Sequence, residues 1–244
     1  MPWFEDERIW ETFYPALFPA PRFDSAQDEI DQLIHLAGVS EGAALDLCCG
    51  PGRHSKALAN RGFQVTGVDR SPFLLGKARE RVDQPEVKFV QADMRSFVRP
   101  FAYNLVVNLM TSFGYFESMD QDLAVLKCVK ASLAPGGVLV LDMVGKEYMA
   151  QVPDTEWRQL PDGRILVEHR EIQPNWSRTH NTWLLVDSEG KTERAEFDLN
   201  LYSGIELVAM LANAGFTDVD LFGSMDGAPY DASAERLIAR ARQE

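Results

Sequence analysis

Residues 44–55 read Ala44-Leu45-Asp46-Leu47-Cys48-Cys49-Gly50-Pro51-Gly52-Arg53-His54-Ser55, an apolar run that ends at two glycines one residue apart. A helical pattern follows at once. Gly50 and Gly52 permit positive φ angles and close approach of the backbone to another molecule. The start of a helix offers N–H groups without intrahelical partners to a polar or anionic group. These residues predict a strand that turns tightly into a helix and forms a ligand-binding corner.

Two residues of this stretch argue against a nicotinamide dinucleotide as the ligand. The dinucleotide-binding fingerprint needs a third Gly or Ala at the position of Ser55. Asp46, at the end of the apolar run, is a buried acid that must be hydrogen-bonded. A dehydrogenase is therefore a disfavoured alternative, and we expect a ligand that carries hydrogen-bond donors.

The composition is that of a water-soluble globular protein of 244 residues, long enough for one well-buried domain with an embellishment. Its formal net charge of -13 disfavours nonspecific binding to nucleic acid or to an anionic membrane. The first twenty residues do not have the pattern of a leader, and no apolar run is long enough for a membrane span. Only three cysteines occur, Cys48, Cys49 and Cys128, which fits a reducing compartment. We expect a cytoplasmic protein.

Strand and helix patterns alternate along most of the chain. We expect helices over residues 30–37, 53–61, 72–82, 123–133 and 204–214, with stops at Gly38, Gly62, residues 135–137 and Gly215. We expect strands over residues 43–47, 63–68, 87–90, 105–109, 138–141, 216–222 and 236–241. This order predicts an α/β fold with a doubly wound, mostly parallel seven-stranded Rossmann-like sheet whose last two strands form a hairpin-like pair.

Two segments lie outside this alternation. Residues 195–201 alternate apolar and polar side chains, and residues 187–190 are a hairpin turn candidate after a strand at 183–186. We therefore expect a small antiparallel β subdomain inserted at 152–202. Residues 1–23 are rich in aromatic side chains and predict an N-terminal aromatic cap on a single domain that spans 1–244.

Acidic and amide side chains fall at the carboxyl ends of successive predicted strands, where parallel α/β sheets bind ligands. Asp46 is followed by Asp69, then by Asp93 beside Met94, then by Asn108 with Leu109. Asp69 lies 19 residues after Gly50, the reach of a carboxylate that accepts hydrogen bonds from ribose hydroxyls. Asp93 with Met94 offers an acceptor for an exocyclic amine and an apolar surface for a purine.

The chain thus resembles a class I S-adenosylmethionine-dependent methyltransferase, of the small-molecule type with an antiparallel insertion. The resemblance covers nearly the whole chain and rests on residues 45–55, on Val65-Thr66-Gly67-Val68-Asp69-Arg70-Ser71-Pro72, on Gln91-Ala92-Asp93-Met94-Arg95, on residues 109–116 and on Leu133-Ala134-Pro135-Gly136-Gly137. It implies that residues 48–52 face the methionine part of S-adenosylmethionine, that Asp69 holds the ribose, and that Asp93 and Met94 hold the adenine.

The resemblance supplies further candidate site residues. The expected cofactor-binding set is Asp46, Cys48, Gly50, Gly52, Arg53, Asp69, Arg70, Asp93, Met94, Asn108 and Leu109. The expected acceptor-binding set is Tyr14, Met110, Phe113 and Tyr115, with Tyr14 and Tyr115 as candidates for contact with the transfer site. Adjacent Cys48 and Cys49 cannot easily converge with His54 on one ion, so we expect no metal.

Three positions depart from the family pattern. Cys48 stands where the family has the first glycine, Asn104 where it has an acid before the fourth strand, and Asn200 where close relatives commonly have an arginine. His169 and His180, in the predicted insertion, are interpreted as solvated strand histidines.

The leading hypothesis is direct in-line methyl transfer from S-adenosylmethionine to a small-molecule acceptor at nitrogen, oxygen or carbon, with S-adenosylhomocysteine as the product. The alternatives are methylation of RNA or protein, and binding of the cofactor without turnover. We expect no nucleic-acid or membrane partner. The inserted sheet could also pair two copies of the chain as a homodimer.

Overall fold

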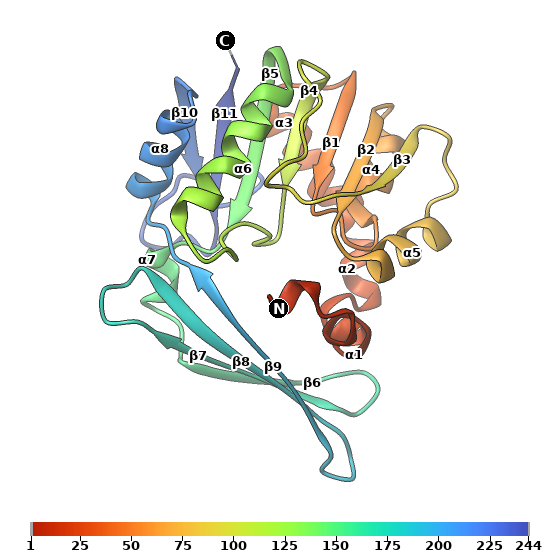
Figure 1. The fold of residues 1–244 in the computed structure, drawn as a ribbon, viewed down its shortest axis with the longest axis vertical. Coiled ribbons are helices and arrows are strands. Elements are labelled where there is room, and N and C mark those ends of the chain that lie inside the picture. Colours follow the sequence, from red (N-terminus) through yellow and green to blue (C-terminus); the bar gives the residue numbers. More distant parts are fainter. Residues whose placement is uncertain (1, 244) are drawn as a thin grey trace.

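The computed structural model describes residues 2–243, and its centre is a twisted sheet of seven strands in the order β10-β11-β5-β4-β1-β2-β3 (Figure 1). The strands are β1 (Ala43–Leu47), β2 (Gln64–Asp69), β3 (Val87–Gln91), β4 (Tyr103–Asn108), β5 (Leu133–Met143), β10 (Asp218–Phe222) and β11 (Leu237–Arg242). All are parallel except β11, which pairs antiparallel with both β5 and β10. The expected domain and cap limits at residues 1 and 244 lie outside the described range.

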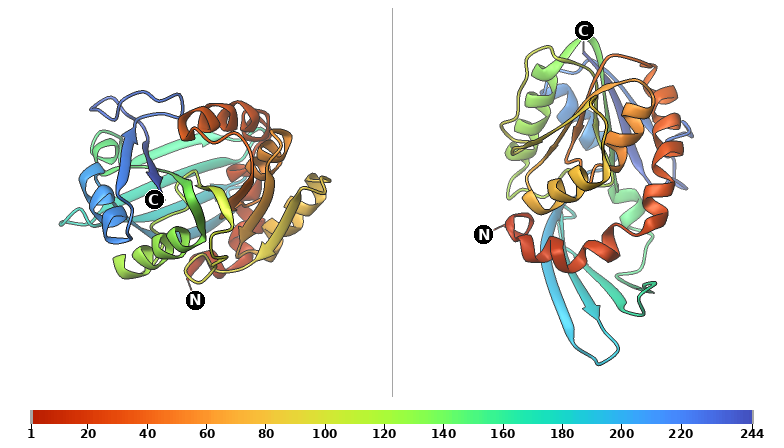
Figure 2. Two further views of the ribbon diagram at one scale, coloured as in Figure 1. Left: turned by 90° about the horizontal axis from the view of Figure 1, so that it is seen from above. Right: turned by 90° about the vertical axis from the view of Figure 1, so that its right-hand side faces the viewer.

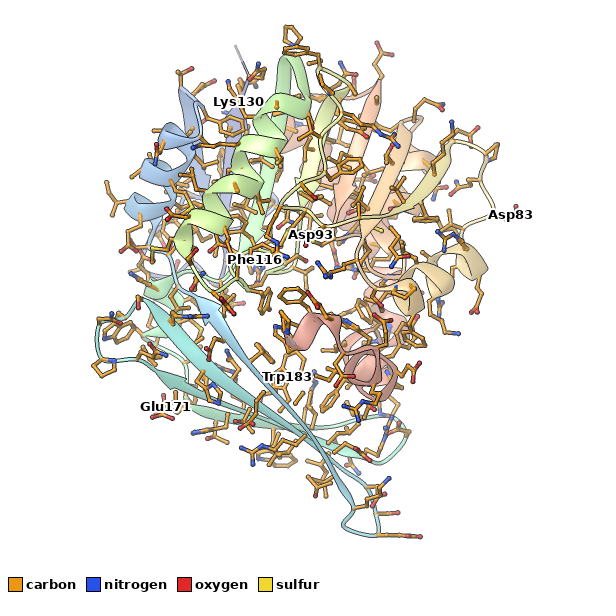
Figure 3. All side chains as sticks on the ribbon, in the orientation of Figure 1. Asp83, Asp93, Phe116, Lys130, Glu171 and Trp183 are labelled. Atoms are coloured by element: carbon orange, nitrogen blue, oxygen red, sulfur yellow. The ribbon has the colours of Figure 1, made fainter. Side chains whose placement is uncertain are left out.

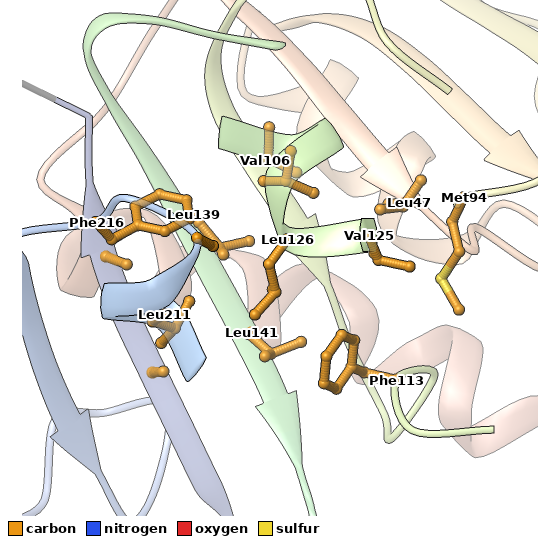
Figure 4. Packing of buried hydrophobic residues seen from close by; sticks show 14 of the residues in the cluster. Leu47, Met94, Val106, Phe113, Val125, Leu126, Leu139, Leu141, Leu211 and Phe216 are labelled. Atoms are coloured by element: carbon orange, nitrogen blue, oxygen red, sulfur yellow. The ribbon is translucent and has the colours of Figure 1, made fainter. Parts of the chain in front are cut away.

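Helices cover both faces of this sheet (Figure 2). Helices α3 (Ala26–Ala37) and α4 (Arg53–Asn60) pack against one face, and α6 (Met119–Ser132) and α8 (Gly204–Asn213) pack against the other. Helix α5 (Pro72–Arg81) packs on β2 and β3. Alternate strand residues serve the two faces, so that Leu105 faces α3 and α4 whereas Val106 faces α6 (Figure 4). The doubly wound α/β fold is confirmed.

A second, antiparallel sheet lies beyond the carboxyl ends of the central strands (Figure 1). Its strands are β6 (Thr155–Gln159), β7 (Ile165–Ile172), β8 (Arg178–Val186) and β9 (Thr192–Asn200), and the short helix α7 (Lys146–Met149) leads into it. The predicted turn at residues 187–190 joins β8 to β9. Antiparallel structure was expected here, but the sequence pattern did not single out β6, β7 or α7.

The N-terminal segment lies between the two sheets (Figures 1 and 2). It consists of the 3₁₀ helix η1 (Trp3–Glu5) and the helices α1 (Glu7–Leu17) and α2 (Ala20–Asp24). Phe13 and Ala16 of α1 are buried against Leu166, Leu185 and Ala195 of the antiparallel sheet. On the opposite side, Glu7 accepts hydrogen bonds from the Ser71 hydroxyl (2.7 Å) and the Phe73 amide (3.0 Å) at the start of α5. The segment therefore bridges the two sheets.

Strand β5 begins five residues earlier than predicted, at Leu133 instead of Val138. Helix α6 already ends at Ser132, and residues 135–137, predicted as its stop, lie inside β5, where they bend the strand without terminating it. Leu133 already pairs with Tyr103, and an irregularity in the pairing separates it from Leu105 and Val138. Gly136 takes up a positive φ of 75° and its amide donates to the Gln243 carbonyl, so the bend is paired to the end of the chain.

A buried carboxylate joins the antiparallel sheet to helix α6. Asp122 is fully buried, and its Oδ2 accepts hydrogen bonds from Asn200 Nδ2 (2.7 Å) and the Tyr202 hydroxyl (2.6 Å). Asn200 also donates to the Phe116 carbonyl (3.0 Å). Burial raises the pKa of Asp122 to about 6, while its two donors oppose that rise. Asn200, one of the departures from the family pattern, therefore has a structural role at the end of β9.

We expect Tyr202→Phe to lower the free energy of unfolding by about 1.5–3 kcal/mol where Asp122 is ionised, the cost of losing a hydrogen bond to a charged group. Because the pKa of folded Asp122 lies above that of an unfolded Asp, ionisation itself reduces stability as the pH rises through about 6. The loss should thus be larger near pH ~8 than near pH ~5.5 in urea unfolding. Tyr148→Phe is the control, and equal losses at both pH values would contradict the assignment to Asp122.

Candidate functional site

A cavity of about 210 Å³ lies between the carboxyl ends of the central strands, the N-terminal segment and the antiparallel sheet. Figure 3 shows three labelled side chains around it, namely Asp93 after β3, Phe116 after β4 and Trp183 of β8. Its wall has a polar half and an aromatic half. The polar half includes Asp46, Asp69, Asp93, Arg70, Arg22, Arg53 and His54, and the aromatic half includes Trp3, Phe4, Trp10, Tyr115, Phe116 and Trp183.

The glycine corner predicted from sequence forms the floor of the polar half. Cys48, Gly50 and Gly52 all have positive φ angles, of 62°, 53° and 78°. Gly52 caps helix α4, and a Cβ there would lie 3.0 Å from Phe89, so glycine is required on two grounds. The buried Asp46 accepts a hydrogen bond of 2.6 Å from Ser55 in the first turn of α4. This bond ties β1 to the helix and explains why Ser55 replaces a third glycine.

Asp69, the last residue of β2, presents a carboxylate to the cavity. Its Oδ2 accepts from the Gly50 amide (2.8 Å) and its Oδ1 from the Ser71 amide (2.9 Å). Each oxygen keeps a further lone pair for a ligand. Burial raises the pKa of Asp69 to about 6, although the backbone donors counteract this. Asp69 is therefore a buried acid whose ionised form would be stabilised by further hydrogen-bond donors from a ligand.

Asp93 and Met94 follow β3 at the next position along the sheet. Asp93 pairs with Arg95 (2.6 Å) and with Arg70, and the hydrogen bond from Arg95 is the main reason why its pKa lies below the usual range. Arg70 also pairs with Glu5 of η1 at 2.6 Å. The Met94 sulfur lies 3.3 Å from Cys48 Sγ. An acidic acceptor and a soft apolar surface thus adjoin at one end of the cavity.

Cationic side chains lie at the other end of the polar half. Arg53 donates to Glu29 (2.8 Å) and to the Arg22 carbonyl (2.8 Å), while its Nη2 is buried without a partner. Burial opposes the charge of Glu29, but hydrogen bonds from His54 and Ser25 and the charge of Arg53 outweigh it and lower the Glu29 pKa to about 2. Arg53 is thus neither exposed nor a plain surface residue. This end of the cavity suits an anionic group.

Arg22 of helix α2 was not predicted as a site residue. It lines the cavity, and within residues 2–243 its guanidinium has no ion pair or hydrogen bond. Burial, followed by the charge of Arg53, lowers its pKa. The sequence held no signal for Arg22, because only the folding of the N-terminal segment across the sheet brings it beside Arg53.

The aromatic half comes from three separate segments. Trp3 stacks on Phe197 of β9 (ring centroids 4.7 Å apart) and contacts Tyr115 and Trp10, each with centroids 5.1 Å away. Trp183 packs edge-on against Phe197. Burial raises the pKa of Tyr115, so its phenol stays neutral. This half offers π surfaces and neutral hydroxyls to a ligand.

Met110 and Thr111, directly after β4, have φ angles of 58° and 59°. Such angles cost a non-glycine residue of order 1–3 kcal/mol each, and a β-branched residue rarely adopts them. Buried Asp142 of β5 holds the turn, because its Oδ2 accepts from the Met110 amide (2.8 Å) and its carbonyl from the Thr111 amide (3.0 Å). Arg236 pairs with Asp142 Oδ1 at 2.7 Å. Both strained residues line the cavity.

Four predicted site residues do not line the cavity. Phe113 is fully buried in the core beside Tyr202 (Figure 4), because the chain turns it toward helix α6. Asn108 points sideways and donates to the Leu47 carbonyl (3.0 Å). Gly52 lies behind the corner against Phe89. Tyr14 packs between Phe18 and Phe73, and its buried hydroxyl has no partner.

The remaining expectations concern metals and isolated polar residues. In the described chain, no group of three or more His, Cys, Asp or Glu side chains could hold a metal ion. His169 bonds Thr155 and His180 bonds Asp198, both within the antiparallel sheet. Asn104 accepts from the Ala43 amide at the start of β1, at the opposite edge of the sheet from the cavity. No helix within residues 2–243 is long and apolar enough to cross a membrane.

Comparisons with known proteins identify the family of the chain. A family model described as a methyltransferase domain matches residues 44–137. The cypemycin N-terminal methyltransferase of Streptomyces sp is 30% identical over 207 residues, which are 82% of each chain. The putative methyltransferase YqeM of Bacillus subtilis (strain 168) is 26% identical over 88% of this chain and 90% of its own.

Among solved structures, the S-adenosylmethionine-bound amino pentose methyltransferase CalS10 of Micromonospora echinaspora shares the fold. The TM-score is 0.72 at 24% identity, over 96% of this chain and 97% of that one. Sequence motifs, fold and extended similarity point the same way. The chain belongs to the class I S-adenosylmethionine-dependent methyltransferases, and its cofactor is S-adenosylmethionine.

Proposed function

We propose that this methyltransferase acts on a small molecule and that the acceptor atom is an amine nitrogen. The observation that carries the proposal is the aromatic half of the cavity. Its lining side chains contain neutral hydroxyls and π surfaces but, within residues 2–243, no carboxylate or imidazole placed to remove a proton. A neutral amine has its lone pair available and needs no general base, whereas an alcohol or an acidic carbon does.

The polar half fits the cofactor through its free hydrogen-bonding groups. We assign the ribose hydroxyls to Asp69, which has unused lone pairs, and the adenine to Asp93 and Met94. Arg70 supports Asp93. The methionine carboxylate is assigned to the unpartnered Arg53 Nη2 and to Arg22. Gly50 and Cys48, with Asp46 behind them and Leu109 opposite, shape the floor.

The sulfonium supplies an activated methyl group when the cofactor is bound. The chain then has to exclude water and align the acceptor for in-line displacement. Trp3, Tyr115 and Trp183 lie where they can do both, because the described part of the N-terminal cap (1–23) and the inserted subdomain (152–202) cover the open side of a single domain. Met110 and Tyr115 are the retained acceptor candidates, and Tyr115 acts as a neutral hydrogen-bonding group.

A peptide amine is the second candidate acceptor, since the cypemycin enzyme is named as an N-terminal methyltransferase. The net charge of -13 argues against RNA. Free Cys48, Cys49 and Cys128 favour a cytoplasmic location. We also propose a homodimer through the outer face of the antiparallel sheet, where Trp157 and Ile165 are exposed.

We expect Asp69→Asn to weaken S-adenosylhomocysteine binding by about 1–3 kcal/mol, because two charge-assisted hydrogen bonds lose their charge. Isothermal titration calorimetry measures the change. Asp83→Asn removes an equal charge from an exposed loop and serves as the matched control. Unchanged affinity in a folded Asp69 variant would refute the ribose assignment.

The same contact should depend on pH. Burial raises the pKa of free Asp69 to about 6, and only the ionised carboxylate accepts from both ribose hydroxyls. Affinity for S-adenosylhomocysteine should be constant at pH values above ~7 and fall below ~6 by up to about tenfold per unit. In Asp69→Asn this dependence should vanish, and a wild-type profile that stays flat would contradict it.

Turnover is tested with tritiated-methyl S-adenosylmethionine against separate panels of amines, phenols, carboxylates and short peptides. We expect label in the small amines, and Trp3→Ala should lower kcat/KM by about tenfold or more through lost aromatic packing. Trp176→Ala is the control, because this half-exposed tryptophan lies between β7 and β8 and does not line the cavity. Label confined to peptides would favour the second candidate, and binding without turnover on any panel would indicate a non-catalytic protein.

A further inference from the structure

The hydroxyl of Thr111 has an unusual set of contacts. Its Oγ1 accepts one hydrogen bond from the Val144 amide at 3.2 Å and another from Arg236 Nη2 at 3.1 Å. A hydroxyl oxygen has two acceptor positions and one proton to donate. Both acceptor positions are filled by N–H groups, which cannot accept in return. The Thr111 proton must therefore point toward a third group.

No carbonyl, carboxylate or hydroxyl of the described chain accepts that proton. Thr111 itself lines the cavity beside Met110 and Ser112. The neighbouring Ser112 hydroxyl, by contrast, is already used by the Leu109 carbonyl at 2.8 Å. The Thr111 hydroxyl is thus a hydrogen-bond donor in the cavity wall. Its direction is fixed, and the group that would accept its proton is not part of the described chain.

The direction is fixed by the ion pair between buried Asp142 and half-buried Arg236 behind the turn. Asp142 Oδ1 accepts from Arg236 Nε at 2.7 Å, and the same guanidinium donates to Thr111. Asp142 also receives the Met110 amide, so one carboxylate holds both the strained backbone and the arginine. A donor polarised by a charged neighbour forms a stronger hydrogen bond than an isolated hydroxyl.

The cofactor does not account for this donor. Its amino group donates, and the cations that suit its carboxylate, Arg22 and Arg53, come from helices α2 and α4. Thr111 instead follows β4, and its neighbours Met110 and Tyr115 belong to the acceptor side of the cavity. We therefore assign the group that accepts the Thr111 hydrogen bond to the molecule that receives the methyl group.

We propose that Thr111 is a specificity-determining residue that donates a hydrogen bond to an oxygen of the methyl-accepting molecule. This oxygen is attached to the carbon next to the one that carries the methylated nitrogen. Arg236 and Asp142 are positioning residues for this contact. The inference rests on the proposed amine methylation and narrows it to vicinal amino alcohols and related oxygenated amines. An amine without the neighbouring oxygen leaves the Thr111 proton unpaired on binding, which costs affinity.

The test compares trans-2-aminocyclohexanol with cyclohexylamine as methyl acceptors of the full chain. In Thr111→Val, which keeps the branched shape at this φ angle, KM for the amino alcohol should rise about tenfold with little change in kcat. KM for cyclohexylamine and the affinity for S-adenosylhomocysteine should stay as in the wild type. Thr111→Ser should restore much of the preference, and Thr217→Val, at an exposed loop position before β10, is the matched control.

Arg236→Lys keeps the positive charge but cannot donate to Asp142 and Thr111 in the same fork. It should lose part of the preference for the amino alcohol while its thermal unfolding and cofactor affinity show whether the turn is intact. Equal effects of Thr111→Val on both amines would overturn the proposal and leave amine methylation standing. A matching loss of S-adenosylhomocysteine affinity would overturn it by assigning the donor to the cofactor. Failure of the wild type to methylate either amine, with cofactor binding intact, would overturn the amine assignment and this inference together.

Discussion

The hydrogen bond from the Gly50 amide to Asp69 joins the ends of β1 and β2, and the arrangement of the polar half of the cavity depends on it. It can form only because Gly50 adopts a positive φ and because β1 and β2 are parallel neighbours. The carboxylate that closes this corner also faces the cavity. One side chain therefore completes the backbone turn and presents the acceptor atoms, so the shape and the chemistry of this half cannot vary independently.

The aromatic half of the cavity is built on a different basis. Its walls come from η1, β8 and the loop after β4, three segments that meet only through tertiary packing. Trp3 is central to that packing because its ring contacts Trp10, Tyr115 and Phe197. Arg70 connects the two halves, since it pairs with Asp93 of the polar half and with Glu5, which lies beside Trp3 of the aromatic half. One half of the cavity therefore rests on local strand and turn geometry, whereas the other rests on contacts between distant segments.

Much of the polar half could be predicted from sequence, because the sequence patterns that indicate it are local. The apolar run before Gly50 and the spacing from Gly50 to Asp69 follow directly from strand and helix geometry. Asn108 and Phe113 were expected at the site but do not line the cavity, because strand position alone does not say which way a side chain points at a strand end. Asn108 bonds its neighbouring strand and Phe113 enters the core.

The aromatic half and the cationic end of the polar half were largely beyond prediction, because their contacts are remote in sequence. Arg22 reaches Arg53 across 31 residues, and Asp142 reaches Arg236 across 94. Trp183 lies on a strand whose inner face is defined only once the N-terminal segment packs against it. Periodicity correctly indicated antiparallel structure there, but it carried no information about which face would meet the cavity.

The turn at Met110 and Thr111 has a consequence for protein engineering. Glycine at Met110 would relieve the strain of its positive φ angle, whereas glycine at Thr111 would also remove the hydroxyl that accepts from the Val144 amide and from Arg236. Within the described chain, the Met110 side chain makes no hydrogen bond that opposes the backbone strain, whereas two such bonds oppose it at Thr111. A design that relaxes this turn with glycine should begin at Met110 and leave Thr111 in place.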